Sequence, residues 1–123
     1  MSVRVLVVDD SVSDREVVKG MLRQAGHEVV GEAASGEQAL SQYQVLCPDV
    51  VIMDLVMPQM NGCDAARAIL RTDPQARIIA MSGLSQPSVQ GEAEEAGVLS
   101  FVPKPIEADD LLAEVQDAMR GTS

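Results

Sequence analysis

The chain has 123 residues, of which 46% are hydrophobic and 23% charged, so it can form one domain with a buried core. Nineteen acidic residues against nine basic ones give a net charge of −10, which disfavours binding to nucleic acid or to an anionic membrane. No apolar run reaches about 18 residues and the N-terminus lacks the features of a signal peptide, so we predict a cytoplasmic protein. Cys47 and Cys63 do not have the spacing of a zinc site.

Short β-branched runs alternate with segments of helical spacing, beginning with a Val-rich strand over Val3–Val8 that ends at Asp9 and Asp10. The next segment predicts a helix, with Ser13 as the expected N-cap and Gly26 as the expected stop. These two signals bound the first strand–helix unit.

Two further units follow. His27–Ala33 is the second predicted strand, and Ser35-Gly36 opens the second helix. Val50–Met53 is a third buried strand that ends at Asp54. After a loop, apolar residues at helical spacing predict a third helix whose buried face contains Ala65, Ala66, Ile69 and Leu70.

The last two units have the same form. Arg77–Met81 is the fourth predicted strand and ends at Ser82, and residues 87–96 form the fourth helix. Val98–Val102 is the fifth strand, followed by a Pro-Lys-Pro loop that carries Lys104. The final helix has an apolar face of Ala108, Leu111, Leu112, Val115 and Met119.

Five strands that alternate strictly with five helices predict an α/β fold with a parallel sheet, right-handed crossovers and helices on both faces. The flavodoxin-like, doubly wound order 2-1-3-4-5 is the expected arrangement of five such units. We expect residues 1–123 to form a single domain with no output domain.

The carboxyl ends of the predicted strands carry the polar residues. In the order 2-1-3-4-5, strands about 4.8 Å apart would gather five side chains into one pocket, namely Asp9, Asp10, Asp54, Ser82 and Lys104. Clustered carboxylates repel one another unless a cation intervenes, and Mg²⁺ (or Mn²⁺) suits such oxygen ligands. With the metal bound, Asp54 could act as a nucleophile toward phosphorus while Lys104 neutralises charge.

The segments VRVLVVDDS, VIMDLVMPQMNG, IIAMSG and FVPKP resemble, in order and spacing, the signature segments of the response-regulator receiver domains of two-component systems. The resemblance covers essentially the whole chain. It implies that Asp54 is the phosphorylated residue and also a metal ligand. It further implies that Asp10 binds the metal directly, that Asp9 helps through water, and that the carbonyl of Val56 completes the shell.

The same resemblance implies a conformational switch. Ser82 would turn toward the phosphoryl group, Lys104 would contact it, Phe101 would be the aromatic that turns inward, and Pro105 would follow a cis peptide bond. The phosphoryl group would come from a histidine kinase or a histidine phosphotransfer protein. A downstream protein would then bind the fourth helix, fifth strand and fifth helix, as in stand-alone chemotaxis-type regulators. The chain would catalyse only its own phosphorylation and dephosphorylation.

Three questions stay open at this stage. A terminal switch and a phosphorelay intermediate are not distinguished. An FMN carrier of the same fold is disfavoured because Asp9 and Asp10 would repel the flavin phosphate. An aspartyl-phosphate phosphatase is disfavoured because no second acid closely follows Asp54.

Two local features suggest how this chain differs from others. Val56 and Leu84 each lie two residues beyond a site residue and cannot hydrogen-bond an attacking water, so we predict slow loss of the phosphoryl group. Pro87 and Gly91 weaken the fourth helix, since an interior Gly costs about 1 kcal/mol relative to Ala. We therefore expect the fourth helix to be the least ordered.

Overall fold

The structure is a computed structural model that describes residues 2–57, 62–83 and 87–120, and only the backbone of residues 87–89. Its strands are β1 (Arg4–Val8), β2 (Glu28–Ala33), β3 (Val50–Asp54), β4 (Ile78–Ser82) and β5 (Ser100–Pro103). Its helices are α1 (Val12–Gln24), α2 (Gly36–Leu46), α3 (Gly62–Thr72), α4 (Pro87–Ala96) and α5 (Ala108–Arg120). The strands form one parallel sheet in the order β2-β1-β3-β4-β5, which confirms the predicted fold.

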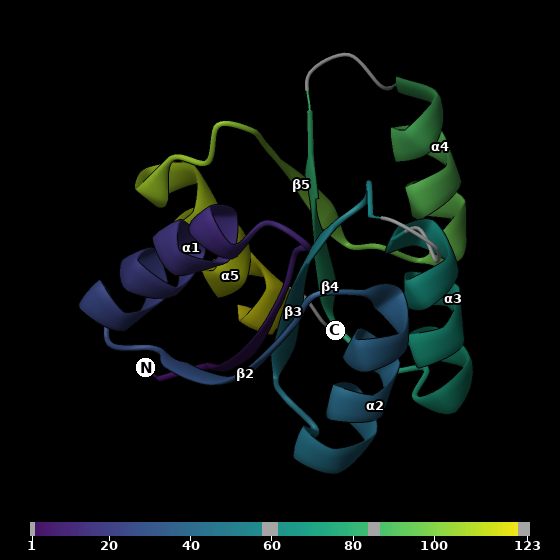
Figure 1. Cartoon of the computed structure of the whole chain (residues 1–123), viewed down its shortest axis with the longest axis horizontal. Helices are drawn as coiled ribbons and strands as arrows, with labels where there is room; N and C mark the ends of the chain where they lie inside the picture. Colours follow the sequence, from purple (N-terminus) through teal and green to yellow (C-terminus); the bar gives the residue numbers. More distant parts are fainter. Residues whose placement is uncertain (1, 58–61, 84–86, 121–123) are drawn as a thin grey trace.

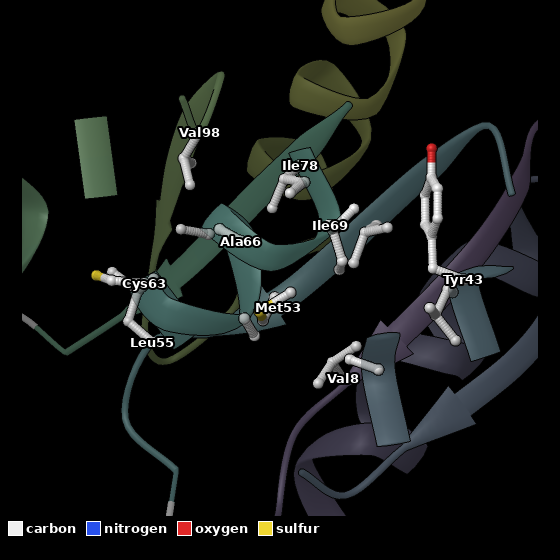
Figure 2. Close-up of a cluster of buried hydrophobic side chains, with 14 of the residues drawn as sticks. Val8, Tyr43, Met53, Leu55, Cys63, Ala66, Ile69, Ile78 and Val98 are labelled. Carbon is white, nitrogen blue, oxygen red and sulfur yellow. The ribbon is translucent and has the colours of Figure 1, made fainter. Parts of the chain in front are cut away.

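Helices cover both faces of the sheet. Helices α1 and α5 lie on one side, and α2, α3 and α4 lie on the other (Figure 1). Alternate residues of each central strand point to opposite sides, so β3 places Val51 and Met53 in one apolar cluster and Val50 and Ile52 in the other. Figure 2 shows the cluster that packs under α2 and α3. Because both faces are buried, the strands read as continuous apolar runs.

The ends of the first two helices test the predicted caps. The prediction of Ser13 as N-cap is wrong, because the Asp14 N–H donates to the hydroxyl oxygen of Ser11 at 3.2 Å and the helix begins at Val12. Both serines can cap a helix, and the turn of the backbone after Asp10 decides between them. The second helix opens at Ser35-Gly36 as predicted, and Ser35 is its N-cap. Gly26, with φ +88°, follows the end of α1 as predicted.

Each of the five strands differs from its predicted bounds by one or two residues. β1 begins at Arg4 and β2 at Glu28, one residue later than predicted, β4 begins at Ile78 and not at Arg77, and β5 extends to Pro103. β3 includes Asp54 and β4 includes Ser82, so each of these residues is the last of its strand. Ladder pairing sets Asp54 opposite Met81. β5 begins at Ser100, later than predicted, because the Val98 N–H donates to the carbonyl of Ala93 in α4.

The start of α3 packs directly against the backbone at the end of β3. The Gly62 N–H donates to the carbonyl of Leu55 at 2.9 Å. A Cβ atom on Gly62 would lie 2.5 Å from the Asp54 carbonyl oxygen and 2.6 Å from the Leu55 Cα, so a larger residue does not fit there. No helix within the described ranges has the length and apolar character needed to cross a bilayer.

Candidate functional site

Three carboxylates gather at the carboxyl edge of the sheet. Asp9 and Asp10 follow β1, and Asp54 ends β3, the neighbouring strand. Each offers an oxygen that lies within 4.8 Å of the other two. Asp9 is fully buried and Asp54 is 7% exposed, whereas Asp10 is exposed. The predicted convergence of these residues is therefore present in the structure.

The ammonium group of Lys104 lies within this cluster. Its Nζ is 3.0 Å from Asp54 Oδ2, 3.0 Å from Asp9 Oδ2 and 3.1 Å from Asp14 Oδ2. The backbone holds Lys104 beside β4, since its N–H donates to the Ser82 carbonyl at 2.9 Å. The peptide bond from Lys104 to Pro105 is cis.

Backbone N–H groups orient the two buried carboxylates. The Val56 N–H donates to Asp54 Oδ1 at 3.0 Å, and the Ser11 N–H donates to Asp9 Oδ1 at 2.9 Å. Both oxygens of Asp9 and both of Asp54 are thus engaged, one by a backbone N–H and one by Lys104. Within the described residues, the Asp10 side chain makes no hydrogen bond or ion pair. Its carboxylate is the one most available to a ligand from solvent.

Burial and charge act in opposite directions on these groups. Burial raises the pKa of Asp54 above its ordinary value, against the lowering effect of the Val56 N–H and of Lys104. Burial alone would lower the pKa of Lys104, but the hydrogen bonds that its ammonium donates to Asp9 and Asp54 outweigh this effect and raise that pKa above its ordinary value. Lys104 is therefore charged near neutral pH. One ammonium among several carboxylates leaves excess negative charge at the site.

The donor set fits a hard divalent cation. Mg²⁺ binds oxygen ligands at about 2.0–2.1 Å, so ligands on opposite sides of the ion are about 4.2 Å apart. Carboxylate oxygens within 4.8 Å of one another can reach such an ion with small movements. Asp10, Asp9 and Asp54 are the described side chains that could hold it. Val56 lies two residues after Asp54, with a half-exposed side chain.

The two predicted switch residues lie on the strands farther along the sheet. Ser82 is 1% exposed, and its hydroxyl oxygen accepts a hydrogen bond from Gln90 Nε2 of α4 at 3.1 Å. Phe101 pairs with Ala80 in the sheet and packs, half-buried, against the apolar cluster on the α2–α4 side. Leu84 lies outside the described residues.

Three residues that contact the site were not predicted from the sequence. Asp14, in the first turn of α1, shares the Lys104 ammonium. Arg15 donates to the Asp9 carbonyl at 2.6 Å and pairs with Glu32 at 2.8 Å, and Gln90 reaches Ser82. The position of Asp14 just after two acidic site residues was an available signal, because a helix's first turn lies close to the loop before it. Arg15 and Gln90 had no comparable signal.

Comparison with known proteins identifies the family. The model for the response regulator receiver domain matches residues 5–116. The chain is 44% identical over 107 residues to the chemotaxis protein CheY of Thermotoga maritima, covering 87% of this chain and 89% of the relative. It is 40% identical over 119 residues to CheY of Bacillus subtilis, covering 97% of this chain and 99% of the relative.

A solved structure supports the same assignment. The CheX–CheY–BeF3–Mg²⁺ complex from Borrelia burgdorferi matches with a TM-score of 0.90 at 28% identity, covering 95% of this chain and 89% of that one. Fold, site geometry and relatives agree. The chain belongs to the response regulator receiver family, and it is a phosphoacceptor signalling protein of the two-component type.

Proposed function

We propose that Asp54 is the residue that accepts the phosphoryl group, beside a Mg²⁺ ion held by Asp10 directly, by Asp9 through water, by Asp54 and by the Val56 carbonyl. One observation carries this proposal: the Lys104 ammonium lies 3.0 Å from Asp54 Oδ2, with Asp9 and Asp10 in the same cluster. A nucleophilic carboxylate beside a fixed cation and a metal-binding acid pair is the arrangement that phosphoryl transfer requires.

The protein takes part in only one bond-forming step of the transfer. An oxygen of Asp54 bonds to phosphorus as the bond from phosphorus to the donor's imidazole nitrogen breaks, and that nitrogen regains a proton from solvent. The bound Mg²⁺ would supply positive charge to offset the phosphoryl oxygens. Lys104 supplies a second, fixed positive charge at the same place. The donor class is a phosphohistidine on a histidine kinase or histidine phosphotransfer protein.

The response is a shift between two conformations. Phosphorylation favours the state in which Ser82 turns toward the phosphoryl group and Phe101 turns inward, which alters the surface of α4, β5 and α5 for a downstream protein. The CheY relatives make a chemotaxis role the leading candidate for that output. Beyond this switching, the only catalysis we assign is the chain's own phosphorylation and dephosphorylation. A single-domain architecture and a cytoplasmic location stay predictions.

Labelling with a small phosphodonor tests the proposal. Acetyl phosphate with Mg²⁺ should add one phosphoryl group to the unaltered chain, and addition should fail without Mg²⁺ or in Asp54→Asn. Asp117→Asn is a matched control, because it removes the same charge from an exposed residue at the far end of α5. Labelling of Asp54→Asn to the level of the control would show that another residue accepts the group.

A further inference from the structure

The hydroxyl of Ser82 is already engaged, and its partner comes from α4. Gln90 Nε2 donates to Ser82 Oγ at 3.1 Å. Ser82 is 1% exposed and Gln90 is partly exposed, so the bond is partly buried. This hydrogen bond must be broken or replaced before the hydroxyl can donate to another acceptor.

The direction of this bond opposes the direction in which Ser82 would act. Alternate strand residues point to opposite faces of the sheet. Ile78 and Ala80, which share the face of Ser82, lie in the apolar cluster on the α2–α4 side. Val50 and Ile52, which share the face of Asp54, lie in the cluster on the α1–α5 side. The Ser82 hydroxyl therefore faces α4, and turning toward Asp54 takes it away from Gln90.

We propose that Gln90 is a positioning residue that holds Ser82 in the unphosphorylated conformation and so sets the balance between the two states; this inference rests on the function proposed for Asp54 and Ser82. Gln90 touches neither the phosphoryl group nor the metal ligands and acts only through the Ser82 hydroxyl. When Ser82 turns to the phosphoryl group, Gln90 loses its partner, and α4 loses a polar tie to β4. One hydrogen bond thus connects the acceptor site to the helix expected to change.

A second polar tie of α4 provides a control. Arg67 of α3 pairs with Glu92 of α4 at 3.2 Å, and both side chains are partly exposed. Breaking this pair with Glu92→Gln weakens the attachment of α4 without altering the Ser82 hydroxyl. Gln90→Leu removes the donor while keeping similar size and helix propensity, so it should leave α4 formed.

The test is the apparent affinity for beryllium fluoride, a phosphoryl mimic, measured at saturating Mg²⁺ by fluorine NMR. A net hydrogen bond is worth a factor of about 2 to 12 in an equilibrium constant, so Gln90→Leu should bind beryllium fluoride about 2- to 12-fold more tightly than the unaltered chain. The gain should vanish when Ser82→Ala is present in both proteins. Glu92→Gln should give no gain that depends on Ser82.

Each other outcome overturns a specific claim. If the unaltered chain neither binds beryllium fluoride nor is labelled by acetyl phosphate, the function proposed for Asp54 fails. If it does bind but Gln90→Leu has equal or weaker affinity, Gln90 does not restrain Ser82. A gain of the same size with and without the Ser82→Ala change would mean that residue 90 acts on α4 alone, and the inference would again be wrong.

Discussion

Asp14 is an additional negative charge at the proposed phosphoryl site, and removing it should speed phosphorylation. Its Oδ2 and that of Asp54 lie against the same Lys104 nitrogen, at 3.1 and 3.0 Å, so they are at most about 6 Å apart. The side chain of Asp14 is 48% exposed, against 9% for Asp54. The substitution Asp14→Asn keeps the shape of the side chain and removes its charge.

The magnitude follows from Coulomb's law with solvent screening. We take the incoming phosphoryl group as a dianion about 6 Å from the Asp14 carboxylate. The repulsion between them is about 1.4 kcal/mol in water, and physiological salt reduces it to roughly 0.7 kcal/mol. We use the dielectric constant of water because Asp14 is half-exposed, and exposed charges interact weakly. Asp14→Asn should therefore be phosphorylated about threefold faster by acetyl phosphate.

The assay is the initial labelling rate at saturating Mg²⁺ and subsaturating acetyl phosphate. Saturating Mg²⁺ matters because losing a nearby negative charge should also weaken metal binding. The advantage of Asp14→Asn should shrink as the ionic strength rises, while Asp117→Asn should match the unaltered chain. An equal or slower rate, or an advantage independent of salt, would refute the electrostatic reasoning.

Three further outcomes are expected. Gly91→Ala should stabilise the protein by about 0.5–1 kcal/mol in urea unfolding, because alanine favours the helix and its Cβ would meet no atom within 4 Å. In the unaltered chain we expect residues 88–96 to exchange their amide hydrogens faster than the other helices do. Gly91→Ala should slow that exchange. Tyr43→Phe should destabilise it by about 1–2 kcal/mol at pH 7, since the hydroxyl donates to Asp73 at 2.7 Å. Burial, with help from Asp73, raises the pKa of Tyr43 in the folded protein. The stabilisation by the hydroxyl is therefore complete below the pKa of the unfolded phenol, about 10, and decreases above it. The stability difference between the unaltered chain and Tyr43→Phe should be smaller at pH 11 than at pH 7. Val56→Asn combined with Leu84→Glu should shorten the phosphoryl lifetime, followed by loss of label over time, and an unchanged lifetime would contradict it.

The fold was predictable because each element carries its own periodicity. Runs such as Val50–Met53 are buried on both faces, and the strict alternation with helices leaves few arrangements of the sheet. Asp54, Ser82 and Lys104 could be placed together because they end or follow parallel strands. Strand order alone brings their backbones to the same edge.

What could not be predicted depends on side-chain conformation. Lys104 has four rotatable bonds, and nothing in the sequence says that its ammonium reaches Asp14 as well as Asp9. The contact of Gln90 with Ser82 requires a particular rotation of α4 about its axis, which the weak apolar pattern of that helix does not define. Ser11 and Ser13 offer the same capping chemistry, so only the backbone path could choose between them.

The contact of Gly62 with the backbone of Asp54 and Leu55 has a consequence for the direction of signalling. The start of α3 packs so closely against the end of β3 that displacement of Asp54 toward α3 would cause a backbone clash. Helix α4 lies beside α3 on the same side of the sheet, and it is tied to Ser82 by one side-chain hydrogen bond that can be broken. A conformational change that begins at Asp54 would therefore displace α4 and β5 and leave the start of α3 in place.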